Sequence, residues 1–211
     1  MTLIYRSVYN FRVGNNTNSK DTILECALQL FGERGYEAVG ITEITRSAGI
    51  TKPTLYYFFQ SKEGVFKAIL EKYYERFNRL LQSGCSYVPH PEFYEEDVFP
   101  VLQKLVKIYF SFARDNTTFY LMLLSLSFAP PTAKTTIIAK PYFVRQYEII
   151  TALFHDFSDI HTNLKGKELE SAYHFIALIN ANIGFWYQGI TRLDEERAER
   201  IVHQFMHGIF S

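Results

Sequence analysis

The sequence lacks the features that mark membrane and secreted proteins. No apolar run reaches the roughly 18 residues that a membrane-spanning helix needs, so we expect no contact with a membrane. The apolar start of the chain is broken by Arg6 and Asn10 and no small-residue cleavage site follows, which argues against a signal peptide. Cys26 and Cys85, the two cysteines, are too few for a disulfide framework. These absences predict a cytoplasmic protein.

Motifs typical of enzymes are also missing. We find no serine or cysteine nucleophile motif, no glycine-rich phosphate loop and no paired-carboxylate pattern, and we expect neither catalysis nor a cofactor. His203 and His207 have the i, i+4 spacing at which two imidazoles can share a metal ion. Because they have neither the glutamate of an HEXXH motif nor an obvious third ligand, we predict no metal site.

The charges are balanced overall but unevenly placed. The chain has 22 basic and 22 acidic side chains, which argues against a general polyanion binder. Residues 1–82 contain 11 Lys and Arg against 8 Asp and Glu, whereas residues 83–211 contain 11 against 14. This imbalance suggests that only the first part of the chain contacts nucleic acid.

Apolar residues recur at helical spacing along most of the chain, and no strand-like alternation is present. One helix is predicted from Asp21 to Gly35, two short helices flank Gly49, and a long helix opens at Ser61 and ends at Gly84. After a proline-rich break, further helices are predicted at 98–112, 119–128, up to 157, near 166–188 and from 194 onward. Pro141 either kinks the third of these or delays its start. The prediction is an all-α fold of about nine helices.

The segment 40–63 has the pattern of a helix-turn-helix. Gly49 can adopt the left-handed φ of a tight turn, and Thr51 can cap a second helix that tolerates Pro53 in its first turn. Ile44 and Leu55 are then expected to face each other across the turn. Two short helices joined in this way present the second one to the major groove of DNA.

From about Asp21 to Leu70, the chain resembles the tetracycline-repressor (TetR) family of regulators. The pieces that carry the resemblance are ILECALQLFGERGYEA and ITEITRSAGITKPTLYYFFQSKEGVFKAIL, in this order and spacing. Two departures are Thr45, where the family usually has alanine, and Gly40, where a serine or threonine cap is usual. The resemblance implies an arm at 1–18, a three-helix DNA-binding domain at 19–65 and a helical effector-binding and dimerisation domain at 66–211. It also implies repression through a palindromic operator, by analogy.

The resemblance and the helix geometry together give the residues expected to face DNA. They are Thr42, Arg46, Thr51, Lys52, Thr54, Tyr56, Tyr57 and Lys62. Lys52 and Thr54 are expected to read base edges, whereas Lys62, at a helix N-terminus, is expected to contact a phosphate. The tyrosines could instead fill the core, and Arg46 could occupy an ordinary solvated face. One of Phe58 and Phe59 is expected to pack under the helix.

The last two predicted helices carry stripes that suit a homodimer interface. Small residues on the first allow another helix to approach closely, and the second has an apolar stripe. The predicted interface is Ala177, Ala181, Gly184, Gln188, Ala198, Ile201, Val202, Phe205 and Ile209. Both stripes could instead pack within one chain.

The aromatic-rich second half predicts an apolar pocket for a small hydrophobic effector. The expected lining is Phe110, Tyr120, Leu124, Phe128, Tyr147, Tyr173 and Asn180. Since no Lys and Arg cluster converges there, we expect a neutral or weakly polar ligand. These rings could also simply fill the core. Two other functions remain open: a helical carrier or enzyme with a helix-turn-helix-like bend, and a structural interaction module.

Overall fold

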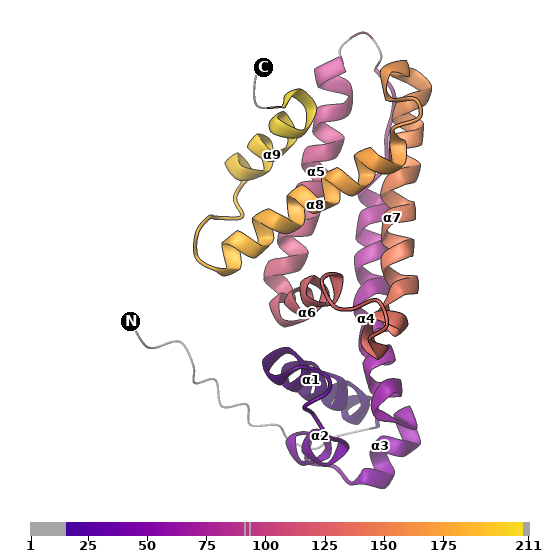
Figure 1. Ribbon diagram of the computed structural model, residues 1–211, viewed down its shortest axis with the longest axis vertical. Coiled ribbons are helices and arrows are strands. Elements are labelled where there is room, and N and C mark those ends of the chain that lie inside the picture. The colour runs from indigo at the N-terminus through magenta and orange to yellow at the C-terminus, as the bar shows by residue number, and fades with distance from the viewer. Residues whose placement is uncertain (1–15, 91, 93, 209–211) are drawn as a thin grey trace. The chain divides into compact units, whose positions relative to one another are not determined.

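The computed structural model describes residues 16–90, 92 and 94–208 (Figure 1). Within these ranges the chain forms nine α-helices and one 3-10 turn, with no strand, which confirms the all-α prediction. The chain divides into two compact units, and the boundary falls between Phe66 and Lys67, inside helix α4. None of the described helices is long and apolar enough to cross a bilayer.

The first unit contains α1 (Asn16–Arg34), α2 (Ile41–Ser47), α3 (Lys52–Phe59) and the first residues of α4 (Lys62–Gly84). Helix α1 begins before Asp21, because an apolar pattern marks only the buried part of a helix and a polar turn can extend it. The last residues of the expected arm are therefore helical, and residues 1–15 lie outside the described part of the chain.

The core of the first unit is aromatic where α1 meets the start of α4. Phe31, Tyr36 and Phe66 are all buried, and their ring centroids are 5.1 to 6.0 Å apart. Ile23, Ala27 and other apolar residues at helical spacing along α1 are also fully buried. The apolar periodicity of the sequence thus identifies the inner face of this helix.

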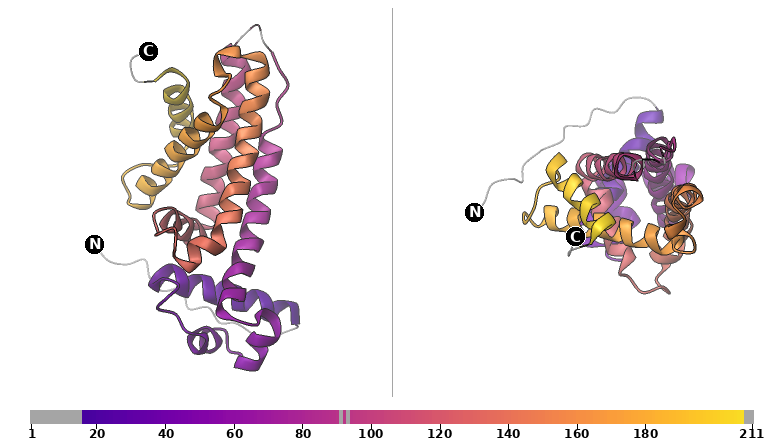
Figure 2. Two further views of the ribbon diagram at one scale, coloured as in Figure 1. Left: turned by 45° about the vertical axis from the view of Figure 1, so that its right-hand side comes forward. Right: turned by 90° about the horizontal axis from the view of Figure 1, so that it is seen from above.

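The second unit contains the rest of α4 and five further helices. They are α5 (Tyr94–Asp115), α6 (Thr117–Ser127), α7 (Lys134–Ile160), α8 (Glu168–Tyr187) and α9 (Glu195–His207), with a 3-10 turn at Thr162–Leu164. Within this unit α8 crosses α5 and α7 obliquely, packing most closely on α7, and α9 packs on α5 (Figures 1 and 2). Helix α7 already begins at Lys134 and contains Pro141. The alternative that Pro141 delays the start of this helix is therefore wrong.

Stacked aromatic rings fill the core of the second unit. Phe77 stacks on Phe112 with centroids 4.2 Å apart, and Tyr73 stacks on Phe119 at 4.5 Å. These contacts join α4 to α5 and to α6. Phe112, Phe119 and other buried aromatic residues of this half of the chain are therefore part of the core.

A buried carboxylate fixes the loop between α4 and α5. Asp97 accepts hydrogen bonds from the Tyr87 hydroxyl (2.7 Å) and the His90 backbone N–H (2.8 Å), and its Oδ2 lies 2.6 Å from Nε2 of His161. Burial by itself would raise the pKa of Asp97, but these hydrogen bonds outweigh it and lower the pKa below its ordinary value. The cluster joins the loop, the first turns of α5 and the C-terminal end of α7.

Candidate functional site

The turn between α2 and α3 has the geometry that the sequence predicts. Gly49 adopts φ +65°, and the backbone N–H of Ile50 donates to the Thr45 carbonyl at 3.0 Å. Thr51 caps α3, with its hydroxyl accepting from the Thr54 N–H at 3.4 Å. Ile44 and Leu55 are both fully buried. These features confirm the helix-turn-helix.

The residues expected to face DNA from α2 and α3 lie on the surface of the first unit. Tyr57 is 81% exposed and Tyr56 is 47% exposed, so neither fills the core. Thr54 is half-buried and its hydroxyl is 2.9 Å from that of Thr51. The remaining residues of this set are all exposed: Thr42, Arg46, Thr51 and Lys52.

The two phenylalanines of α3 differ in burial. Phe59 is 6% exposed and packs under the helix, whereas Phe58 is half-buried. This agrees with the expectation that one of the two is part of the core. The polar and aromatic residues before them therefore form the exposed face of α3.

Lys62 is not positioned as expected. Its ammonium group donates to the backbone carbonyls of Tyr36 (3.0 Å) and Val39 (3.1 Å), and it lies 4.1 Å from the centroid of the Tyr36 ring. Two carbonyl oxygens and an aromatic face surround this charge, which favours an internal role for Lys62 over the expected phosphate contact. Lys62 connects the start of α4 to the loop after α1.

The two departures from the family pattern have local compensations. The Gly40 N–H donates to the Glu43 carboxylate at 2.9 Å, and Arg34 pairs with that carboxylate at 2.8 Å, so α2 has a cap although Gly40 has no side chain. The hydroxyl of Thr45 is buried and donates to the Thr42 carbonyl at 3.1 Å. Neither departure leaves an unsatisfied polar group at the turn.

Sequence reasoning missed the tight connection between α3 and α4. Gln60 adopts φ +64°, which was not expected, whereas the predicted start of the long helix at Ser61 is confirmed, since the Ser61 hydroxyl accepts from the Gly64 N–H at 3.0 Å. A Cβ added to Gly64 would overlap with the carbonyl oxygen of Phe59. The glycine is therefore required by a close backbone approach, which no local pattern announces.

A groove in the second unit contains part of the expected effector pocket. It has a volume of about 590 Å³, lies between α6, α7 and α8, and has no Lys or Arg in its lining. Four of the expected pocket residues line it, namely Leu124, Phe128, Tyr147 and Asn180. The Tyr120 hydroxyl donates to Oδ1 of Asn180 at 2.6 Å. Trp186, the single tryptophan, is half-buried on α8 next to Phe185 of the groove lining.

Three expected pocket residues do not line this groove. Tyr120 is 2% exposed and is hydrogen-bonded to Asn180 without being part of the lining. Phe110 is 1% exposed in the core and borders a different groove, beside Leu193, because its position on α5 faces the segment before α9. Tyr173 is 45% exposed and lines a neighbouring groove of about 310 Å³ with Tyr147. Since an aromatic side chain suits a core and a groove equally well, the sequence could not tell which of these places each residue occupies.

The stripes expected at a dimer interface have different environments. The expected residues Ala177 and Ala181 on α8 and Gln188 at its C-cap are exposed, Gly184 is half-buried, and all four line the same groove. On α9, the expected apolar residues are buried inside the chain itself: Ala198, Ile201 and Val202.

The apolar stripe of α9 thus packs within the second unit, as the alternative proposed. Phe205 contacts the rings of Phe175 at 5.1 Å and Phe154 at 5.9 Å. Helix α9 uses its apolar face against its own chain because α5 offers a matching surface. Ile209 lies outside the described residues.

The imidazole rings of the histidine pair on α9 lie close together. The rings of His203 and His207 are 4.7 Å apart. Among the described residues, no group of three or more His, Cys, Asp or Glu side chains is placed to hold a metal ion.

Comparison with known proteins matches the first unit to a family and both units to known folds. Residues 23–69 match the family described as "Bacterial regulatory proteins, tetR family". The HTH-type transcriptional repressor ComR of Escherichia coli (strain K12) is 41% identical over 58 residues. That alignment covers 28% of this chain and 28% of ComR, so it spans little more than a quarter of the length of this curated relative.

Solved structures extend the likeness in fold over most of the chain. A putative fatty acid metabolism regulator of Clostridium perfringens has a TM-score of 0.74 at 20% identity, covering 90% of this chain and 99% of that one. The transcriptional regulator FadR of Bacillus subtilis, solved in complex with stearoyl-CoA, has a TM-score of 0.73 at 14% identity, covering 90% and 98%. At these identities the likeness establishes the fold alone.

Proposed function

Since this chain belongs to the tetR family of bacterial regulatory proteins, we propose that it represses transcription by binding a palindromic operator as a homodimer and is released by a small hydrophobic effector. The observation that carries the proposal is the exposed polar and aromatic face of α3 behind a correctly formed Gly49 turn. A helix held in this way enters the major groove with its N-terminal residues. The name of the repressor ComR supports repression by analogy.

The DNA contacts are assigned from exposure and chemistry. Lys52 and Thr54 stand at the N-terminal end of α3 and suit base edges, whereas Tyr56 and Tyr57 suit phosphates. Thr42, Arg46 and Thr51 complete the surface. Because the hydroxyl of Thr54 lies within hydrogen-bond distance of Thr51, the two threonines orient each other at the point of contact.

The proposed dimer uses α8. Its small residues Ala177 and Ala181 are exposed, and so is the larger apolar residue Phe185, which is 49% exposed and lines the same groove. An apolar helix face of this kind marks an interaction surface. A two-fold dimer places two α3 helices on a palindrome with half-sites about one helical turn apart.

The proposed effector site is the groove between α6, α7 and α8. Its size falls within the range of small-molecule sites, and Tyr147 and Asn180 provide the few polar groups that such sites use for orientation. The regulator FadR of B. subtilis was solved with stearoyl-CoA, which joins an acyl chain to a phosphorylated carrier. Because no basic side chain lines the groove, we propose a neutral or weakly polar lipid-like compound. We also propose that this chain is cytoplasmic and has no catalytic activity.

The test is DNA binding measured by fluorescence anisotropy. Duplexes from the region upstream of the gene for this chain are compared with random duplexes, in the presence and absence of a panel of hydrophobic compounds. We expect Lys52→Ala to cost about 1–3 kcal/mol on the specific duplex and little on the random one. Lys165→Ala, on the surface of the second unit, is the matched control.

Equal losses on both duplexes would remove Lys52 from base recognition. A chain that binds hydrophobic compounds but no DNA would be a carrier or enzyme, and one that binds neither would be an interaction module. The helix-turn-helix geometry and the tetR match make these alternatives the less favoured ones.

A further inference from the structure

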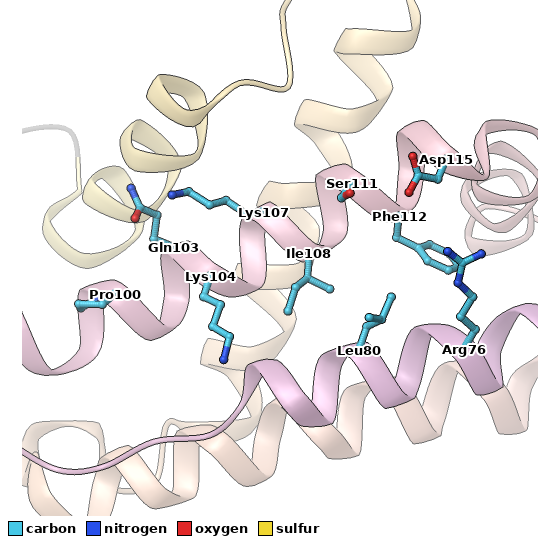
Figure 3. A pocket seen from close by; sticks show the side chains of 10 residues that line it. All are labelled: Arg76, Leu80, Pro100, Gln103, Lys104, Lys107, Ile108, Ser111, Phe112 and Asp115. Atoms are coloured by element: carbon cyan, nitrogen blue, oxygen red, sulfur yellow. The ribbon is translucent and has the colours of Figure 1, made fainter.

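A second groove of the second unit differs in chemistry from the one proposed for the effector. It has a volume of about 430 Å³ and lies between α4 and α5 (Figure 3). Leu80, Ile108 and Phe112 form its apolar floor, and Phe112 is fixed from below by its stack on Phe77. The two grooves share no lining residue.

The two helices that form this groove approach each other closely near Ile108. A Cβ on Gly84 would come within 2.6 Å of Cδ1 of Ile108, so the last turn of α4 is in close contact with α5 there. Nearby, the ammonium group of Lys104 donates to the Ser83 carbonyl at 3.1 Å. Because an ammonium group has three donors, this bond leaves Lys104 able to donate to a ligand as well.

Positive charge predominates along the groove. Arg76 and Lys104 extend from opposite ends of the floor toward the space between α4 and α5, whereas Lys107 points to α9, where it pairs with Glu195 (Figure 3). Asp115 is the only carboxylate of the lining and lies at the same end of the groove as Arg76, opposite Lys104. An anionic group is therefore favoured at the Lys104 end.

We propose that this groove binds a small amphipathic anion, with its acidic head at Lys104 and its apolar chain along Ile108 and Leu80 toward Phe112. Lys104 and Phe112 are eight residues apart on α5, a span of about 12 Å, which suits a medium-length alkyl carboxylate. The exposed apolar surface of Leu80, 39% exposed, would be covered by the chain. Such a ligand bridges α4 and α5 and opposes their separation.

The probe for this site is decanoate below its micelle concentration, titrated calorimetrically into the full chain. Decan-1-ol tests the need for the charge, and inorganic phosphate tests the need for the chain. Lys104→Gln removes the cation, and Ser111→Trp fills the groove from its exposed rim. Lys140→Gln on the surface of α7 controls for general charge, and Ala181→Trp obstructs the other groove.

We expect decanoate to bind once per chain and about fivefold more weakly to Lys104→Gln, as for an exposed ion pair. Ser111→Trp should abolish binding, and the two controls should leave it unchanged. In Ala181→Trp, in which the effector groove is obstructed, decan-1-ol and phosphate should each bind more weakly than decanoate.

Four outcomes would overturn the proposal: no binding of decanoate, unchanged binding to Lys104→Gln and Ser111→Trp, loss only in Ala181→Trp, or phosphate binding as tightly as decanoate. The titration uses no DNA. Its result is therefore independent of whether the chain is a repressor.

Discussion

At the scale of single residues, Lys62 links two segments of the first unit that are far apart in sequence. Its ammonium group is held by the carbonyls of Tyr36 and Val39 and by the face of the Tyr36 ring. Hydrogen bonds from a charged donor contribute about 1.5–3 kcal/mol, and their loss leaves the carbonyl groups to find other partners.

We therefore expect Lys62→Ala to lower the free energy of unfolding by about 1–3 kcal/mol. Because this ammonium group is engaged within the protein, the slope of log affinity for DNA against log salt should stay unchanged. Loss of a phosphate contact would instead reduce that slope by about 0.9. Urea unfolding and salt titrations check the two parts separately, and an altered slope at unchanged stability would restore the phosphate assignment.

Gly64 provides a second prediction at this scale. Gly64→Ala places a methyl group on the Phe59 carbonyl, which belongs to the backbone and cannot move aside alone. We expect a loss of about 2–3 kcal/mol or more in the free energy of unfolding, among the larger effects of point substitutions. Gly184→Ala is the control, since its Cβ would meet no atom within 4 Å and alanine favours a helix. Equal thermal midpoints for the two variants would contradict the close approach.

Single residues were predictable where local rules act. The φ of Gly49 and the cap at Thr51 follow from turn and capping chemistry within a few residues. Lys62 was not predictable, because its partners lie more than twenty residues earlier in the chain and only the folded unit brings them together.

At the scale of helices and loops, Asp97 holds the α4–α5 loop against α5 and α7. Its pKa in the folded chain lies below the ordinary value of 3.8, owing to hydrogen bonds that outweigh the effect of burial. A lowered pKa means that the carboxylate contributes stability above pH 3.8, and that this contribution is lost as the pH falls through the folded-state pKa.

We expect Asp97→Asn to lower the thermal midpoint at pH 7, with a difference from the wild type that shrinks as the pH falls below about 4. Thermal unfolding between pH 7 and pH 3 measures this difference. Asp159→Asn, at an exposed position of α7, is the control and should parallel the wild type. A difference that stays constant over the whole range would show that the Asp97 charge makes no pH-dependent contribution.

Helix α9 shows what periodicity alone leaves undecided. Its apolar stripe was correctly placed on one face, with Asp194 as a cap whose carboxylate accepts from the Arg197 N–H at 2.9 Å. The same stripe could pack on a second chain or on α5, since both surfaces are apolar. The stripe packs within its own chain because the folded chain places α5 and α8 next to α9.

At the scale of the whole molecule, the fold could be predicted and the grooves could not. Nine helices follow from apolar spacing and from turn residues such as Gly35 and Gly84, because these act locally. A groove depends on how far neighbouring helices separate, which is set by many contacts at once. Hence Asn180 lines the groove between α6, α7 and α8, whereas Phe110, which was also expected to line the pocket, lies in the core.

The proposed assembly leads to one prediction for the whole molecule. Ala181→Arg places a charge on the exposed stripe of α8, and we expect a monomer at micromolar concentration in light scattering. Affinity for the palindrome should fall with it, because one α3 reads too few base pairs alone. Gln82→Arg, exposed on α4, should remain dimeric. A dimeric Ala181→Arg would mean that the subunits meet elsewhere.

The single tryptophan of the chain has a practical consequence. Trp186 is half-buried on α8, beside Phe185, whose side chain lines the groove between α6 and α8. Indole emission, excited selectively over the tyrosines, therefore originates from this helix alone. A shift in its wavelength or a change in quenching by iodide would report on the surroundings of α8 in the unlabelled protein. The chain thus contains its own optical probe at the place where ligand and subunit contacts are proposed to meet.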